Sequence, residues 1–230
     1  MSEILISINP FAEFLEATPS RQKNIIREQL NPDPVRVPYY QLARATMRKS
    51  ILNNVNISII QEAINELNTR TPERGNWRYH DKVNSITALE KFKTMLLPSH
   101  LVENKLEAVK TKVKYLPIYG VNIKVSPNLI FRTTINGQKV IGAFKIHTSK
   151  GKPFGHQQSA LVAQLINQFL STYVAEEDEF VDPQLCFCID VFAGTTINSS
   201  SKIGYNMKQI IDVCKQIPKL WDDASMSDAA

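Results

Sequence analysis

Residues 129–148, LIFRTTINGQKVIGAFKIHT, are the stretch that decides the fold. Two apolar runs, 129–135 and 140–148, flank the dipeptide Asn136-Gly137. Asn-Gly is the strongest short hairpin signal, because both residues readily adopt the positive φ of a two-residue turn. The segment therefore predicts two long strands joined as a hairpin.

Alternation of apolar and polar residues extends this strand region toward the N-terminus. Val109 to Tyr115 alternate with Lys110, Lys112 and Lys114, which predicts a half-buried strand with a lysine face. Residues 121–126 alternate in the same way and predict a further strand. Farther along, residues 185–192, LCFCIDVF, are almost continuously apolar, as in a strand covered on both faces.

Helical spacing and capping signals occupy the remainder of the chain. Asn9-Pro10 and Thr18-Pro19 each place a capping residue before a proline at the first helical position. We expect helices over about 10–17, 19–30, 39–53, 58–68, 81–97, 156–174 and 207–220, a chain break at 31–38 and a Ser/Thr-rich loop at 195–201. Trp77 and Trp221 are expected in the core.

The order of elements predicts an α+β protein. We expect a helical N-terminal region over 1–76, an α/β core over 77–222 and a disordered tail over 223–230. With 230 residues and 43% hydrophobic composition, the chain is long enough for one generous domain or two small ones.

Composition excludes several classes of protein. No apolar run approaches the roughly 18–20 residues of a membrane-spanning helix, so we expect no membrane partner. The first residues, MSEILISINPFAEF, do not read as a secretory signal. Three cysteines cannot form a disulfide framework, which favours a reducing, cytoplasmic location.

The charge is unevenly distributed along the chain. No carboxylate occurs between Glu107 and Glu176, whereas this segment holds nine lysines and arginines. A field of one sign suits a polyanion such as nucleic acid. A solvated basic face without a ligand, or one that docks on an acidic protein, remains open.

The element order resembles that of the restriction-endonuclease-like, or PD-(D/E)xK, nuclease superfamily. The family core is a helix, three strands, a helix and a further strand, and residues 80–198 cover that order. Ser126-Pro127-Asn128 stands at the Pro-Asp position, and Ala143-Phe144-Lys145 at the D/E-x-K position. The resemblance implies an α-βββ(β)-α-β-α core with a nucleic-acid-facing edge. It would also imply Mg²⁺ bound by acidic residues, with a lysine that helps to activate water.

This sequence departs from the family pattern at both acidic positions. Asn128 replaces the aspartate and Ala143 replaces the acid of the tripeptide. Mg²⁺ is usually bound through one or two carboxylates, so we expect no metal and no other cofactor. The overall pattern is also similar to a group of uncharacterised bacterial proteins.

Three residues are candidates for a catalytic role, and each has a plainer interpretation. Lys145 could contact a phosphate or simply face solvent. Glu90, on the helix before the strands, could join a rearranged metal site. Asp190 interrupts an apolar strand, either as a structural hydrogen-bond acceptor or as an acid that reaches an active edge.

Other polar groups have equally open roles. His147 shares a strand face with Lys145, and Cys186 and Cys188 are expected as buried thiols. Arg44, Arg48 and Lys49 lie near Tyr39 and Tyr40, an arrangement that can hold single strands or can belong to a solvated helix.

The first functional hypothesis is a nucleic-acid-binding accessory subunit on a degenerate nuclease-like fold, in a larger bacterial assembly such as mobile-element or antiviral defence. We expect DNA rather than RNA as the ligand, and a protein partner on the N-terminal helices. The expected nucleic-acid contacts are Lys110, Lys112, Lys114, Lys124, Arg132, Lys145, Lys150, Lys152 and Gln157. The alternatives are an active Mg²⁺-dependent phosphodiesterase and a protein–protein scaffold with a basic docking face.

Overall fold

The computed structural model describes residues 3–32 and 39–227. The expected chain break at 31–38 lies largely outside these residues. In chain order the elements are β1 Ile4–Ser7, α1 Ile8–Glu16, α2 Pro19–Leu30, α3 Gln41–Leu52, α4 Ile57–Thr69, α5 Trp77–Lys93, α6 Ser99–Glu103, β2 Glu107–Val109, β3 Tyr115–Ile118, β4 Val121–Lys124, β5 Leu129–Ile135, β6 Gln138–His147, α7 His156–Tyr173, β7 Phe180–Asp190, β8 Thr195–Asn198 and α8 Ile203–Ser227. The protein is of mixed α and β structure, as predicted.

The β5–β6 hairpin is the centre of the larger sheet. The two strands pair antiparallel from Leu129–Phe144 to Ile135–Gln138, and Asn136 and Gly137 have φ of 51° and 80° at the turn. The described strands of this sheet have the order β2-β5-β6-β7-β8, and β7 runs parallel to β6. The predicted hairpin is thus confirmed.

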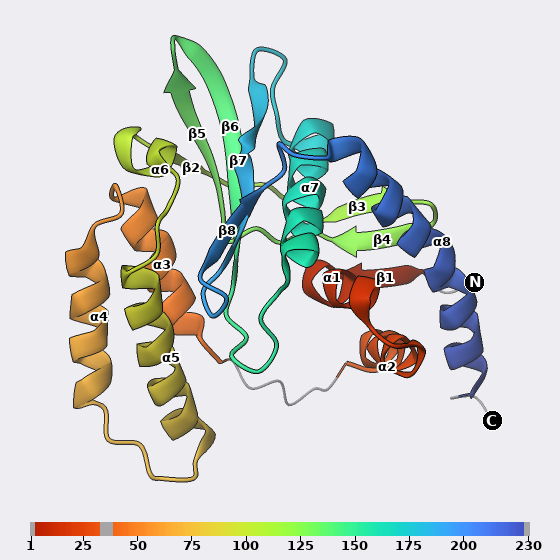
Figure 1. Cartoon of the computed structure of the whole chain (residues 1–230), viewed down its shortest axis with the longest axis horizontal. Helices are drawn as coiled ribbons and strands as arrows, with labels where there is room; N and C mark the ends of the chain where they lie inside the picture. The colour runs from red at the N-terminus through yellow and green to blue at the C-terminus, as the bar shows by residue number, and fades with distance from the viewer. Residues whose placement is uncertain (1–2, 33–38, 228–230) are drawn as a thin grey trace.

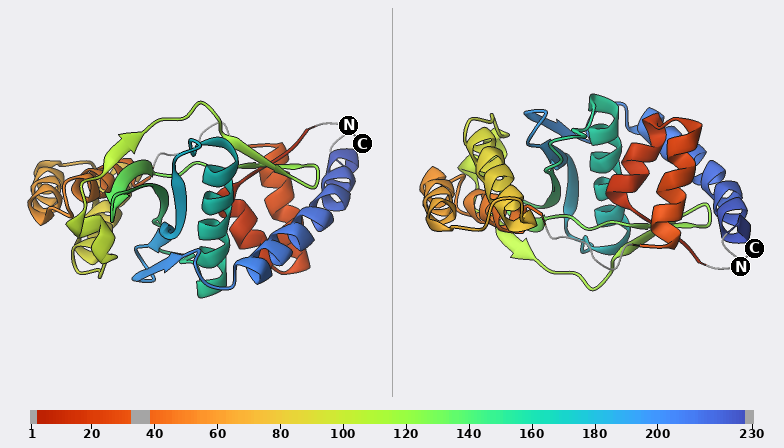
Figure 2. Two further views of the ribbon diagram at one scale, coloured as in Figure 1. Left: turned by 90° about the horizontal axis from the view of Figure 1, so that it is seen from above. Right: turned by 90° about the horizontal axis from the view of Figure 1, so that it is seen from below.

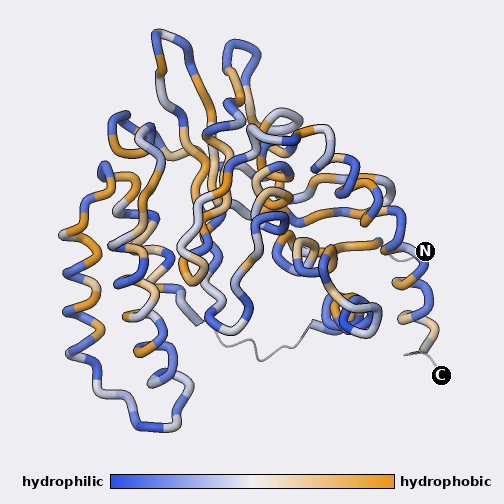
Figure 3. The backbone as a smooth tube through the Cα atoms, viewed as in Figure 1, coloured by the Kyte–Doolittle hydropathy of each residue, from blue (hydrophilic) through white to orange (hydrophobic). Residues whose placement is uncertain are grey.

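Helices cover both faces of this sheet (Figures 1 and 2). On one face, α3, α4 and α5 pack on Phe131, Phe144 and Phe187. On the other face, α7 packs on Ala143 and Cys186, and α1, α2 and α8 surround α7. Adjacent residues of β6 and β7 therefore enter opposite cores, which explains the continuous apolar run that Figure 3 shows along the central strands.

A second, smaller sheet of order β1-β4-β3 lies beside α1 and α8 (Figure 1). β1 pairs parallel with β4, from Ile4–Val121 to Ser7–Lys124. The N-terminal region therefore contributes a strand as well as helices. Its described helices divide between the two faces of the larger sheet, with α1 and α2 on the side of α7 and α3 and α4 on the other.

Several boundaries differ from expectation. The expected strand over 109–115 is wrong in its middle, because residues 110–114 cross from β2 in the larger sheet to β3 in the smaller one. The expected loop at 195–201 contains β8, which pairs with β7. The last helix does not end near Leu220 but continues to Ser227, into the segment expected to be disordered.

Trp77 was expected in the core, but it begins α5 with 37% of its surface exposed. Trp221 is buried, as expected.

Candidate functional site

A cleft of about 580 Å³ opens where four segments meet: the start of α1, the start of α3, the end of β4 and the C-terminal end of β6. Its cationic side chains are Arg44, Lys124 and Lys145. We call this site the basic cleft. Within the described part of the chain, no aspartate or glutamate lines it. The arrangement is suited to an anion.

Lys145 is one of the three cations of the basic cleft. It projects from β6, and its Nζ donates a hydrogen bond of 2.6 Å to the carbonyl oxygen of Ser126. Desolvation by burial lowers the pKa of its ammonium from 10.5 to about 8, and the positive charges of Arg44 and Lys124 act in the same direction. A bound anion would relieve this penalty, because it favours the charged form of the lysine.

Arg44 lines the cleft from α3. Its Nη1 donates a hydrogen bond of 3.1 Å to Oγ1 of Thr148, just beyond the end of β6. Burial lowers the pKa of the guanidinium, whereas the nearby charge of Asp81 raises it. An arginine retains its charge under such conditions, because its ordinary pKa lies far above neutral pH. Arg44 is therefore a fixed cation held in place by a protein contact.

The first turn of α1 also lines the cleft, at Ser7, Ile8, Asn9 and Pro10. The Ser7 side chain makes no capping hydrogen bond to the helix. The buried Oδ1 of Asn9 has no hydrogen-bond partner in the described structure. The free N–H groups at a helix N-terminus carry partial positive charge, so they add to the field of the three cations.

A second depression of about 570 Å³ continues from the cleft and shares Lys124, Ser126 and Asn128 with it. It adds Arg48 from α3 and Lys110 and Lys114 from the crossing segment, and we call it the basic groove. No carboxylate lines the groove among the residues that the structure describes. Cleft and groove together form one continuous cationic surface with six lysines and arginines.

Asp190 has a structural role at the end of β7. Its Oδ2 accepts a hydrogen bond from the backbone N–H of Phe154 at 2.6 Å, and its Oδ1 accepts from those of Phe192 and Ala193 at 2.9 and 2.8 Å. The side chain is fully buried. These three donors explain how a carboxylate is tolerated inside the core. This geometry is that of a structural acceptor, one of the two roles expected for Asp190.

His147 lies beside this carboxylate and away from solvent. Its ring stacks on Phe154 with centroids 3.6 Å apart, and its Nε2 lies 3.0 Å from the carbonyl oxygen of Lys152. Burial lowers the pKa of the imidazole, and the charges of Lys145 and Arg44 lower it further, against the attraction of Asp190. His147 therefore lines the cleft as an uncharged imidazole at pH 7.

The two positions that carry acids in the nuclease family contain no acid and have other structural tasks here. Asn128 Oδ1 accepts a hydrogen bond from the backbone N–H of Ile146, which fixes the start of β5 to β6. Ala143 is fully buried against α7. The structure does not bring Glu90 to the cleft, because it lies exposed on α5, 3.7 Å from Lys93. In residues 3–32 and 39–227, no three His, Cys, Asp or Glu side chains group as metal ligands.

Carboxylates from elsewhere in the chain lie next to part of the acid-poor segment, residues 108–175. Arg132 pairs with Glu176 and Glu179, and Lys139 pairs with Asp178, all from the turn before β7. The expectation that positions 108–175 form one unopposed basic surface is wrong at this end of the sheet. The parallel pairing of β6 with β7 places the acidic turn beside the hairpin.

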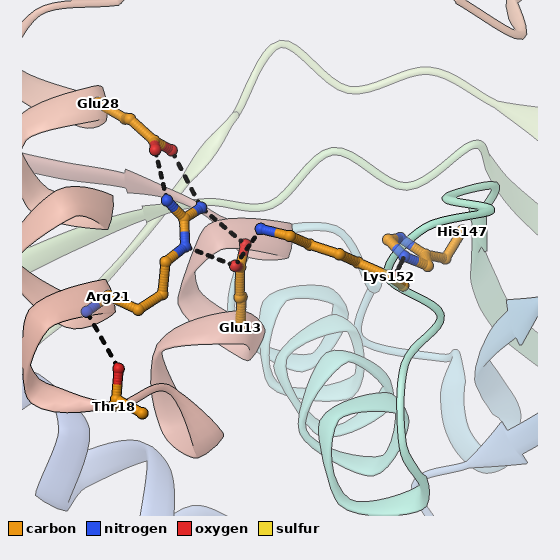
Figure 4. A network of polar contacts seen from close by, with 6 residues as sticks. All are labelled: Glu13, Thr18, Arg21, Glu28, His147 and Lys152. Carbon is orange, nitrogen blue, oxygen red and sulfur yellow. Dashed lines mark hydrogen bonds and ion pairs between the residues drawn. The ribbon is translucent and has the colours of Figure 1, made fainter.

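Lys152 is also paired, in a depression that adjoins the basic cleft at Asn9, Pro10, His147 and Ser149. Its Nζ lies 3.0 Å from Glu13 Oε1, and Glu13 in turn binds Arg21, which also binds Glu28 (Figure 4). This network ties the loop after β6 to α1 and α2. Lys152 is therefore compensated by a carboxylate and lies outside the lining of the cleft.

The remaining predicted contacts divide as follows. Gln157 donates to Asn206 and Gln209 and so joins α7 to α8, away from the cleft. Lys112 and Lys150 are exposed and line neither depression. Of the nine expected residues, the structure gathers Lys110, Lys114, Lys124 and Lys145. Arg44 and Arg48 were expected only as part of a basic and aromatic patch on their own helix. The folded structure places them beside these four lysines.

No protein-family model matches the sequence, and no curated protein matches it significantly. No helix within the described ranges has the length and apolar character needed to cross a membrane.

Proposed function

We propose that this protein binds the phosphate backbone of nucleic acid in the basic cleft and basic groove. The observation that carries the proposal is the convergence of Arg44, Lys124 and Lys145, from α3, β4 and β6, in a cleft without a described carboxylate. Cations held by separate elements around one depression favour an extended polyanion over a single small counterion.

The chemistry of the lining favours binding that depends little on base sequence. Lysines and arginines dominate the polar groups of the groove, and these side chains bind phosphates by charge. We infer DNA as the ligand, held by up to six phosphate contacts. Most of the affinity would then come from the release of counterions.

The same geometry supports an accessory role rather than hydrolysis. Asp190 uses its two oxygens for three backbone donors, and Glu90 lies on the outer surface of α5. A phosphodiesterase that draws these acids to Lys145 would need a different arrangement of both helices and strands. We therefore propose a subunit of a larger bacterial assembly, with its partner on the N-terminal helices.

The test is a salt titration of binding to labelled DNA, measured by fluorescence anisotropy. We expect log affinity to fall linearly with log salt, by about 0.9 for each phosphate contacted on a duplex. Lys124→Gln should weaken binding and reduce the slope by about one contact. Lys139→Gln is the matched control, because it removes the same charge at a site already paired with Asp178.

A flat salt dependence, or equal losses in the two variants, would overturn the proposal. Recovery of a stoichiometric acidic protein from the native host, without DNA binding, would favour the scaffold alternative.

A further inference from the structure

Two aromatic side chains in contact link the basic cleft to a second depression beside α5. Tyr39 lines the cleft, and its ring packs edge-on against Trp77, with centroids 6.3 Å apart and planes at 80°. Trp77 lines a separate depression of about 280 Å³ together with Arg70, Arg78 and Lys82. We call Tyr39 and Trp77 the aromatic pair.

Trp77 is fixed in position and yet open to solvent. It is the first residue of α5, and the side chain of Asn76 caps this helix by accepting from the N–H of Arg78 at 3.0 Å. Trp77 is 37% exposed and belongs to neither core cluster. The guanidinium of Arg78 lies 5.6 Å from the ring centroid and makes a cation–π contact with the indole.

The acid in this depression is engaged by the protein itself. Asp81 Oδ1 accepts hydrogen bonds from the backbone N–H of Tyr40 at 2.6 Å and from Oγ of Ser85 at 3.3 Å. The bond from Tyr40 holds the start of α3 against α5, whereas Ser85 lies on α5 itself. The Tyr40 contact therefore keeps the aromatic pair next to the cations of the cleft.

We infer that the ligand of the basic cleft is single-stranded nucleic acid, with a base stacked on the aromatic pair. The inference rests on the proposed function and specifies its ligand. The bases of a duplex are stacked on one another and offer no face to a side chain, whereas an unpaired base does. Cations that follow the backbone beside exposed aromatic rings are the combination that single strands require.

The experiment compares oligodeoxythymidylate with a duplex of equal length, by anisotropy and by intrinsic tryptophan fluorescence. The chain has two tryptophans, and Trp221 is only 4% exposed, so it serves as an internal reference. We expect tighter binding of the single strand and quenching of Trp77. Trp77→Ala should lower single-strand affinity by about 5- to 150-fold, the range for loss of one stacked base, and Trp77→Phe should retain most of it.

Tyr205→Ala is the matched control, because Tyr205 is 53% exposed on α8, outside the lining of the cleft. Equal or tighter duplex binding, no quenching, or equal losses in Trp77→Ala and Tyr205→Ala would overturn the inference while salt-dependent DNA binding still supports the proposed function. Absence of salt-dependent binding to both forms would instead overturn the proposed function, and the inference with it.

Discussion

Lys145 Nζ and the carbonyl oxygen of Ser126 lie 2.6 Å apart, so the ammonium of β6 is bound to the segment that joins the two sheets. The contact uses one of the three donors of the lysine. The other two donors remain for a ligand in the basic cleft. The charge of the Lys145 ammonium depends on pH.

The affinity for DNA should fall as pH rises above about 8. Burial sets the pKa of Lys145 at about 8 in the free protein, and a bound phosphate raises it. The contribution of the lysine is fully present below the free pKa and is lost as pH rises toward the pKa of the complex. Anisotropy titrations between pH 7 and 9.5 measure this loss. Lys145→Arg should bind with a flat profile, and a steep profile in this variant would contradict the assignment.

Asp190→Asn should destabilise the fold. The carboxylate accepts three backbone N–H groups inside the core, and an amide offers only one oxygen. We expect the free energy of unfolding to fall by about 2 kcal/mol or more, because at least one buried donor loses its acceptor. Urea denaturation measures the change. Asp178→Asn breaks only an exposed ion pair and should leave the free energy of unfolding close to that of the parent, because solvent screens such pairs; similar losses in both variants would refute the structural role.

Gly142→Ala should also lower the free energy of unfolding. A Cβ at this position would lie 2.7 Å from Leu185 Cβ and 2.8 Å from Phe131 Cζ, where the β6–β7 register shifts. Overpacking of this kind costs about 1–3 kcal/mol. In Gly151→Ala the added Cβ meets no atom within 4 Å, so its stability should stay close to that of the parent. Thermal unfolding of the two variants decides the point, and equal midpoints would show that the strands shift without cost.

The three cysteines should be inert to thiol reagents in the native state. Burial raises the pKa of Cys186, Cys188 and Cys214 to about 12, and only thiolates react. With a chromogenic disulfide at pH 8, we expect slow modification of the folded protein and rapid modification of three thiols per chain in denaturant. Rapid reaction of the native protein would mean that the core around α7, which holds all three cysteines, opens readily.

Local signals predicted the elements, and partners distant in the sequence determined what the local signals could not. The Asn136-Gly137 turn fixes a hairpin through the φ angles of its own two residues. β1 has no comparable local signal. It is a strand because it pairs parallel with β4, and this pairing joins Ile4 to Val121, far along the chain. Residues 110–114 alternate like a strand, but they have no strand partner because they leave one sheet for the other.

Only part of the candidate site could be predicted from the sequence, because its residues come from segments that are distant along the chain. The absence of acids over 108–175 pointed to Lys124 and Lys145, which the fold does gather. It could not show that the acidic turn at 176–179 returns to Arg132, because that contact follows from the parallel pairing of β6 and β7. Nor could it place Arg44, which reaches the cleft from a helix about a hundred residues earlier in the chain.

Lys124 ends a strand of the smaller sheet, whereas Lys145 belongs to the larger one. A polyanion that contacts both lysines connects two sheets that share no backbone hydrogen bonds in their strand ladders. A ligand bound only to the native state raises the free energy of unfolding, and the increase grows with ligand concentration. Occupancy should therefore be readable as a rising melting temperature, which offers a label-free screen for the natural ligand.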